Sequence, residues 1–262
     1  MSLNHLPFKV GTGPFNKKME VPGSKSYANR VLILAALCEE EVIINNIPLS
    51  ADVEKMISCL KEVGLVVDIN DNQIVIKNSF PKCETNINNP LTLYTGDGGT
   101  TNRFIIPLLS IGRRKYKIEA EGGMRDRPMD EIISSLESLS TKVTYKEEAW
   151  ISIQGPSKQL DSISIDCSRS TQFATGFLLA YSNTEMRVET TNLDASKSYF
   201  ELTQKLVSEF KNGKREFDVP VDFSSLSYPL ALGAVSKSVK ISNCLEVDKT
   251  QADSVFISIL ER

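Results

Sequence analysis

Apolar and polar positions follow a recurring order of elements along the chain. Residues 27–38 are apolar almost all round and predict a buried helix, and residues 42–47 predict a strand. Apolar side chains at helical spacing then run from Ser50, a candidate N-cap, to Gly64, a candidate stop. Two short strands on either side of residues 70–73 predict a hairpin. The order of the predicted elements is helix, strand, helix and hairpin.

The same order returns in later parts of the chain, with a last copy that lacks its hairpin. The further elements are predicted at 102–111, 115–121, 129–139, 142–153, 162–165, 173–181, 186–191, 200–210, 226–236, 239–242 and 251–260. Units that repeat in this way bury their faces against one another, so the sequence predicts an α/β fold.

Each of the first three units opens its first helix at a turn rich in Gly, Ser or Thr. These turns lie at 23–26, 96–101 and 168–172. If the units pack around a pseudo-threefold axis, the helix N-termini converge on one cavity, where their N–H groups favour an anion. A solvated surface or capping role explains each polar residue there alone. A shared site for a multiply anionic ligand explains Lys25, Arg30, Arg103 and Gln172 together. Arg125 and Arg127 precede another predicted helix, where loop arginines serve either anion binding or anchoring of the loop.

Composition narrows the classes of function. The formal charge of -3 gives no general reason to expect nucleic acid or an anionic membrane as a partner, and no apolar stretch is long enough to span a bilayer. The five cysteines have no CxxC pair, which predicts free thiols and a cytoplasmic location. A single histidine, His5, argues against histidine-based catalysis and metal binding.

Five ordered motifs resemble those of the EPSP synthase (3-phosphoshikimate 1-carboxyvinyltransferase) family. They occupy residues 21–30, 96–103, 127–129, 170–173 and 196–199. The related UDP-N-acetylglucosamine enolpyruvyl transferases carry Ala-Lys-Asn where this chain has Ser24-Lys25-Ser26, together with a loop cysteine that is not seen here. The resemblance implies a transferase of aromatic amino-acid biosynthesis, in the shikimate pathway.

That resemblance also implies the substrates and the residues that contact them. The family transfers the carboxyvinyl group of phosphoenolpyruvate to shikimate 3-phosphate and requires no cofactor or metal. Lys25, Arg127 and Gln172 are the implied catalytic residues. Shikimate 3-phosphate would contact Lys25, Ser26, Arg30, Ser170, Thr171, Gln172, Ser196 and Tyr199, and phosphoenolpyruvate would contact Lys25, Gly99, Thr100, Arg127 and Gln172.

The resemblance maps the chain to the first part of the family protein. It implies a complete three-unit domain at 22–219, an inside-out α/β arrangement of βαβαββ-type units that binds shikimate 3-phosphate. Residues 1–21 with 220–262 would form a second, incomplete domain. The family's carboxylate base and second set of cations have no counterpart in this sequence, and Asp97 and Thr171 depart from the motifs.

Two alternatives to an ordinary enzyme stay open at this point. The chain is either a fragment or a shortened homologue that binds a phosphorylated ligand with impaired catalysis. A structural or protein-interaction module is the third interpretation, but retained cations such as Lys25 and Arg127 would only repel one another there. A monomer is expected if the chain is complete.

Overall fold

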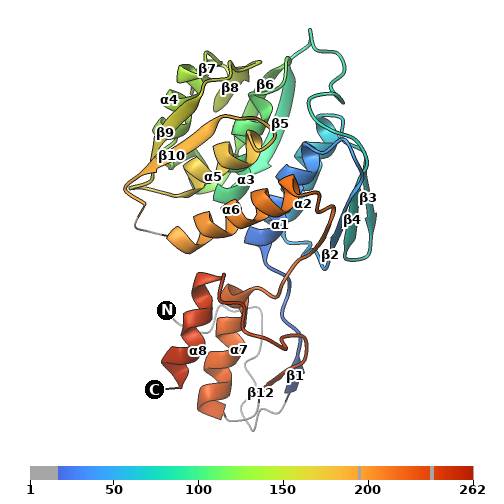
Figure 1. Cartoon of the computed structure of the whole chain (residues 1–262), viewed down its shortest axis with the longest axis vertical. Coiled ribbons are helices and arrows are strands. Elements are labelled where there is room, and N and C mark those ends of the chain that lie inside the picture. Colours follow the sequence, from blue (N-terminus) through green and yellow to red (C-terminus); the bar gives the residue numbers. More distant parts are fainter. Residues whose placement is uncertain (1–16, 194–195, 237–238, 262) are drawn as a thin grey trace.

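The protein has a mixed α/β architecture with a larger and a smaller body (Figure 1). The computed structural model describes residues 17–193, 196–236 and 239–261. The predicted α/β class is confirmed. The part of the smaller body predicted for residues 1–16 lies outside the described residues, as does His5.

The first repeat unit combines two helices with a four-stranded sheet. Its elements are α1 (Lys25–Ala36), β2 (Val42–Asn45), α2 (Ala51–Glu62), β3 (Val67–Asn70), β4 (Gln73–Ile76) and β11 (Glu216–Asp218). The strand order is β11-β2-β4-β3, with β2 antiparallel to β4 and parallel to β11. Ser24 caps α1 by accepting a hydrogen bond from the backbone N of Tyr27 over 3.4 Å.

The second unit repeats this plan without a strand from elsewhere in the chain. Its elements are β5 (Leu91–Gly96), α3 (Gly99–Leu109), β6 (Lys115–Ala120), the 3-10 turn η2 (Gly122–Asp126), α4 (Asp130–Ser138), β7 (Lys142–Tyr145) and β8 (Ile151–Gln154). The strand order is β5-β6-β8-β7. Alternate residues of β6 are buried, as expected for a strand with one face on the core.

The third unit has two parallel strands and two helices. Its elements are β9 (Ser162–Asp166), α5 (Gln172–Ala180), β10 (Arg187–Thr191) and α6 (Lys197–Lys211). Helix α6 is amphipathic and buries apolar side chains such as Leu206 and Phe210.

Helices α1, α3 and α5 pack against one another at the centre of the larger body, and the sheets lie outside them. This explains why all three are apolar on nearly every side. A Cβ atom at Gly176 of α5 would lie 2.2 Å from the backbone O of Arg103 in α3, so only glycine permits this approach. Lys25 and Gly99 lie inside the helices, although the sequence placed them in the preceding turns.

Each unit contains one pair of parallel strands: β11 with β2, β5 with β6, and β9 with β10. The outer strand of the first unit, β11, comes in the sequence only after the elements of the second and third units. The pattern of apolar and polar positions predicts neither β5 nor β11. The three residues of β11 bury only Phe217, which is too little for a recognisable pattern.

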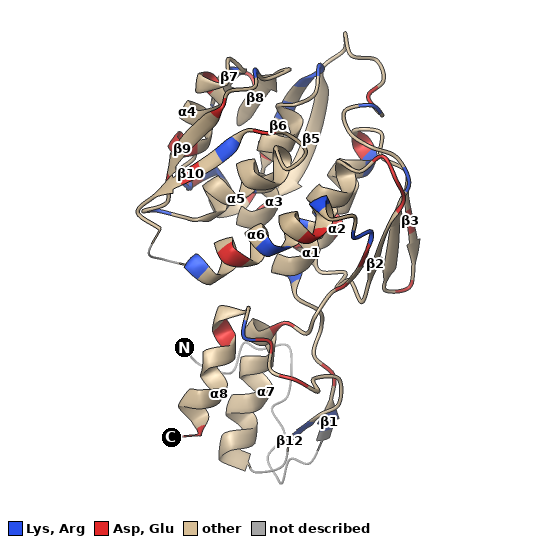
Figure 2. Ribbon diagram, in the orientation of Figure 1, with Lys and Arg blue, Asp and Glu red and all other residues tan. Residues whose placement is uncertain are grey.

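The smaller body contains a two-stranded parallel sheet and two helices. Its elements are β1 (Lys17–Met19), α7 (Phe223–Ser236), β12 (Val239–Ile241), a 3-10 turn (Ala252–Ser254) and α8 (Val255–Leu260). The helix predicted at 251–260 is therefore shorter and follows a turn. Figure 2 shows almost no charged residues on α7 and α8. Within the described ranges, no helix is long and apolar enough to cross a bilayer.

Two extended segments connect the bodies. Gly23 and Val221 form an isolated antiparallel bridge, and the backbone N of Ser24 donates to Pro220 O over 2.7 Å. The buried side chain of Gln251 donates from Nε2 to Val221 O over 2.8 Å. The junction is thus hydrogen-bonded on both segments.

Candidate functional site

Arg30 forms one corner of the site from the second turn of α1. Its side chain is buried and donates from Nε to Thr203 Oγ1 over 2.8 Å, from Nη1 to Ser26 O over 2.6 Å and from Nη2 to Tyr199 O over 3.2 Å. Burial lowers the pKa of Arg30 to about 10, so the side chain remains a cation at neutral pH. Arg30 therefore joins α1 to α6 beside Ser26 and Tyr199.

Arg103 forms a second corner from α3. It is 7% exposed, it donates from Nη1 to Gln172 Oε1 over 2.8 Å, and its guanidinium centre lies 4.8 Å from the ring centroid of Phe173. Burial and then the nearby charge of Arg127 lower the pKa of Arg103. Its Nε is buried without a hydrogen-bond partner. An anion beside Arg103 would offset the unfavourable burial of its charge and could accept a hydrogen bond from its Nε.

Gln172 connects the second and third units at the start of α5. Its Nε2 donates to Thr100 Oγ1 over 3.1 Å, and its backbone N donates to Ser170 Oγ over 3.2 Å. Ser170 therefore supplies the side-chain acceptor at this helix start, while Thr171 is buried beside it. The orientation of the Gln172 amide is fixed by contacts at both of its polar atoms.

Arg127 approaches the start of α3 from the loop after η2. A Cβ atom at Gly99 would lie 2.8 Å from Arg127 Nη1, so glycine leaves the space that the guanidinium needs. Trp150 anchors η2, directly before Arg127, by donating from Nε1 to Arg125 O over 3.3 Å. The loop therefore places Arg127 against the second glycine-rich turn.

Ser196 and Tyr199 close the site at the start of α6. Ser196 has a left-handed backbone with φ +58°, and its O accepts a hydrogen bond from the backbone N of Tyr199 over 3.1 Å. The Tyr199 hydroxyl donates to Asp253 Oδ2 of the smaller body over 3.2 Å. Burial raises the pKa of Tyr199, and the charge of Asp253 raises it further.

These side chains surround a cavity of about 370 Å³. It is lined by Ser26, Arg30, Arg103, Arg127, Ser170, Thr171, Gln172, Ser196 and Tyr199. Among these described residues there are three arginines and no carboxylate, so the cavity favours an anion with several acceptor oxygens. The lining residues come from α1, α3, the start of α5 and the start of α6, together with Arg127 after η2.

Three of the predicted site residues lie beside the cavity and not on its lining. Thr100 contacts Gln172, and Gly99 lies against Arg127. Lys25 forms an ion pair with Asp52, with 3.1 Å between Nζ and Oδ2, and its side chain is 54% exposed. Asp52 lies in the first turn of α2. The spacing of Lys25 and Asp52 carries no sequence signal for their contact.

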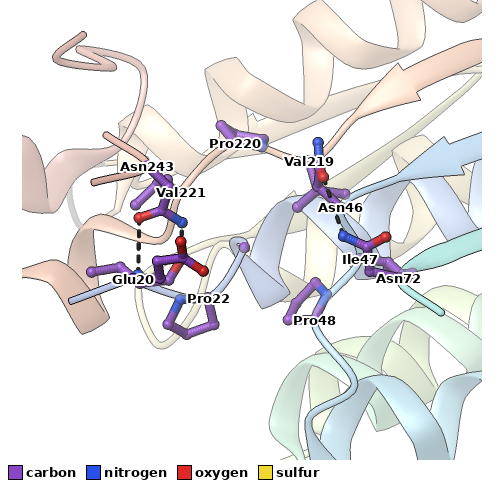
Figure 3. Close-up of a pocket in the computed structure, with 12 residues that line it drawn as sticks. Glu20, Pro22, Asn46, Ile47, Pro48, Asn72, Val219, Pro220, Val221 and Asn243 are labelled. Atoms are coloured by element: carbon purple, nitrogen blue, oxygen red, sulfur yellow. Dashed lines mark hydrogen bonds between the residues drawn. The ribbon is translucent and has the colours of Figure 1, made fainter. Parts of the chain in front are cut away.

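A larger cavity of about 630 Å³ lies at the junction of the two bodies (Figure 3). Proline, asparagine and Val or Ile residues make up most of its lining, and Glu20 is the one charged residue among the described residues that form it. Asn243 pairs with both backbone polar groups of Val21, so its amide is already satisfied. This cavity lacks the cations that an anionic ligand requires, in spite of its size.

Comparisons with known proteins agree with the motifs. The sequence profile of one family, EPSP synthase (3-phosphoshikimate 1-carboxyvinyltransferase), matches residues 10–212. A 3-phosphoshikimate 1-carboxyvinyltransferase of Pyrococcus abyssi is 30% identical over 259 residues, which cover 93% of this chain and 60% of the relative. The corresponding protein of Thermococcus kodakarensis is 31% identical, with 93% and 61% covered.

Solved structures show the same fold. The EPSP synthase of Acinetobacter baumannii superposes with a TM-score of 0.73 at 21% identity, over 88% of this chain and 56% of that protein. A second structure of the enzyme from the same organism gives a TM-score of 0.68. The chain thus spans about 60% of the length of the curated relatives it matches.

Proposed function

Because the chain belongs to the EPSP synthase family, we propose that it takes part in the transfer of the carboxyvinyl group of phosphoenolpyruvate to shikimate 3-phosphate. The observation that carries this proposal is the cavity in which Arg30, Arg103 and Arg127 converge beside hydroxyl and amide groups. The names of the relatives favour transfer over the alternative of a homologue that only binds a phosphorylated ligand.

In this proposal the cavity receives shikimate 3-phosphate. A phosphate ester needs cations and hydroxyl donors, and the ring hydroxyls need neutral hydrogen-bonding groups. The lining offers both kinds of group within one cavity. The proposed contacts are Lys25, Ser26, Arg30, Ser170, Thr171, Gln172, Ser196 and Tyr199.

Phosphoenolpyruvate is proposed to bind at the second glycine-rich turn. Gly99, Thr100, Arg127 and Gln172 are adjacent there through the contacts described above. Lys25 is close to the same turn, because its partner Asp52 accepts a hydrogen bond at its backbone O from Thr101 Oγ1 over 3.0 Å. The two proposed substrates would therefore share Lys25 and Gln172.

The reaction has three parts in this proposal. The methylene carbon of phosphoenolpyruvate gains a proton, and a ring hydroxyl of shikimate 3-phosphate loses its proton as it adds to the neighbouring carbon. The methyl group of the tetrahedral intermediate then loses a proton, the double bond re-forms and phosphate leaves. Lys25 is suited to proton transfer, Arg127 to the stabilisation of phosphate or carboxylate oxygens, and Gln172 to orientation of the reacting groups. Arg103 adds a cation that the resemblance did not assign.

We further propose that residues 22–219 act as the three-unit domain that binds shikimate 3-phosphate. Residues 17–21, 220–236 and 239–261 contribute the described part of the smaller body. A cytoplasmic location, inferred from the cysteines, belongs to the same proposal.

Titration calorimetry with shikimate 3-phosphate tests the proposal. We expect binding of the phosphate ester, at least tenfold weaker binding of unphosphorylated shikimate, and roughly tenfold weaker binding of the ester after Lys25→Ala. Lys82→Ala is the matched control, because Lys82 also forms an exposed ion pair but lies away from the cavity. Equal affinity for shikimate and its phosphate ester would refute the assignment.

A further inference from the structure

Tyr199 lines the cavity, and its hydroxyl forms a hydrogen bond to a carboxylate of the smaller body. Among the described residues, no other side chain of the lining does so. The Tyr199 hydroxyl donates to Oδ2 of Asp253 over 3.2 Å. Tyr199 belongs to α6, whereas Asp253 belongs to the 3-10 turn before α8. The contact therefore links the proposed ligand site directly to the other body.

Asp253 is held in place by its own surroundings. Ser224 Oγ, in the first turn of α7, donates to the same Oδ2 atom. The turn follows Gln251, whose buried amide donates to Val221 O over 2.8 Å and accepts from the backbone N of Phe223 over 3.0 Å. The carboxylate is thus oriented by the smaller body and does not depend on Tyr199 for its position.

The tyrosine is fixed from the opposite side. Its backbone O accepts hydrogen bonds from Arg30 Nη2 over 3.2 Å and from Thr203 Oγ1 over 2.9 Å, and the Arg30 guanidinium lies 5.6 Å from the ring centroid. With the ring held in this way, the direction of the hydroxyl hydrogen is the freedom that remains. A phenol has one hydrogen to donate, so donation to Asp253 excludes donation to a ligand.

The charges around Tyr199 affect which acceptor, Asp253 or a ligand, receives its hydroxyl hydrogen. Arg30, Arg103 and Arg127 line the cavity, and Asp253 lies outside its lining. A hydrogen bond to a carboxylate is stronger than one to a neutral acceptor, so an anionic ligand competes with Asp253 for the same proton. Burial, and then the charge of Asp253, raise the pKa of Tyr199, which keeps the hydroxyl protonated and able to donate.

We propose that Asp253 is a positioning residue that directs the Tyr199 hydroxyl towards the smaller body. An anionic ligand must replace Asp253 as the acceptor of the Tyr199 hydrogen bond. Asp253 therefore weakens anion binding, and binding removes a hydrogen bond between the two bodies. The choice of shikimate 3-phosphate as the ligand rests on the proposed function. The hydrogen bond between Tyr199 and Asp253 is independent of that function.

A double-mutant cycle tests this role by calorimetry, with shikimate 3-phosphate and inorganic phosphate as separate probes. Asp253→Asn keeps the shape but removes the charge, so we expect roughly threefold to tenfold tighter binding. Tyr199→Phe should weaken binding. In the Tyr199→Phe background, Asp253→Asn should change the affinity by less than about twofold, because no hydroxyl remains to be redirected.

Two further variants distinguish the positioning role of Asp253 from a general effect of negative charge and from a structural role. Asp253→Glu retains the charged acceptor and should keep an affinity close to that of the unmodified protein. Asp222→Asn removes another carboxylate whose charge acts on Tyr199 without a hydrogen bond to it, and it should tighten binding less than Asp253→Asn. A merely structural role for Asp253 predicts weaker binding in Asp253→Asn, which is the opposite sign.

Unchanged or weaker binding in Asp253→Asn would overturn the inference, and so would a gain that persists with Phe at position 199. If inorganic phosphate binds but shikimate 3-phosphate binds no better than shikimate, the proposed function fails, and the phosphate cycle still decides the role of Asp253. If neither probe binds the unmodified protein, both proposals are wrong.

Discussion

Arg103 and Gln172 form a hydrogen-bonded pair across two repeat units, with 2.8 Å between Nη1 of the arginine and Oε1 of the glutamine. The same amide donates from Nε2 to Thr100. Because Arg103 is buried and its Nε has no partner, Gln172 is the acceptor on which this cation depends. The pair should therefore contribute to the stability of the fold as well as to the binding of a ligand.

Gln172→Met should destabilise the protein by about 1–3 kcal/mol, since it leaves a buried guanidinium without its acceptor at similar side-chain volume. Chemical denaturation measures the change in the free energy of unfolding. Gln154→Met, at the exposed end of β8, is the control and should change that free energy by less than about 0.5 kcal/mol. Equal effects of the two substitutions would contradict the role assigned to Gln172.

Gly176→Ala should separate α3 from α5. The new methyl group would lie 2.2 Å from the backbone O of Arg103, which cannot move without shifting a central helix. We expect a loss of about 2–3 kcal/mol in the free energy of unfolding. Gly123→Ala is the control, because a Cβ atom there meets no described atom within 4 Å. Retention of full stability by Gly176→Ala would show that the helices can adjust.

Asp248 should make the junction sensitive to acid. Burial acts to raise its pKa, but hydrogen bonds from Thr250 and Gln251 outweigh burial, and the net shift lowers the pKa. A carboxyl whose pKa is lower in the folded state stabilises that state above its unfolded pKa of about 4, and this contribution is lost as the pH falls further.

The free energy of unfolding should therefore differ between the unmodified protein and Asp248→Asn at pH 6, and the difference should shrink as the pH falls below about 4. Denaturation series at several pH values measure it. Asp71→Asn removes an exposed carboxylate from the turn between β3 and β4 and controls for the general effect of charge. A difference that is constant with pH would rule out the linkage.

Trp150 should report on ligands that reach Arg127. It is the single tryptophan of the chain, is 1% exposed and donates to Arg125 O in η2, the turn directly before Arg127. Phosphoenolpyruvate, added with shikimate 3-phosphate, should therefore produce a saturable change in tryptophan emission. The change should disappear in Arg127→Gln and persist in Arg169→Gln, which removes an exposed arginine that pairs with Asp130. An identical titration in Arg127→Gln would exclude the loop as its source.

Much of the larger body could be predicted from the sequence because its central helices leave strong patterns. The apolar run after Ser24 and the glycine-rich turn before Asn102 each indicated a buried helix with a polar start, and residues of both helices line one cavity. The functional roles of the lining residues remain predictions. They depend on ligands, which neither the pattern nor the fold contains.

Other features could not be predicted because they arise only between distant segments. The contacts of Lys25 with Asp52 and of Tyr199 with Asp253 join residues on separate elements, and a carboxylate on a surface helix or turn has no distinguishing sequence pattern. Arg103 was placed among the converging cations, but its dependence on Gln172 needed the packing of α3 against α5.

The pairing of β11 with β2 has a consequence for how the chain folds on the ribosome. Residues 42–45 are synthesised early, but their parallel partner at 216–218 emerges only after the second and third units. Until then one edge of β2 has unpaired backbone groups, which is a site where nascent chains associate wrongly. The N-terminal unit, although translated first, should therefore be the last of the three to complete its sheet.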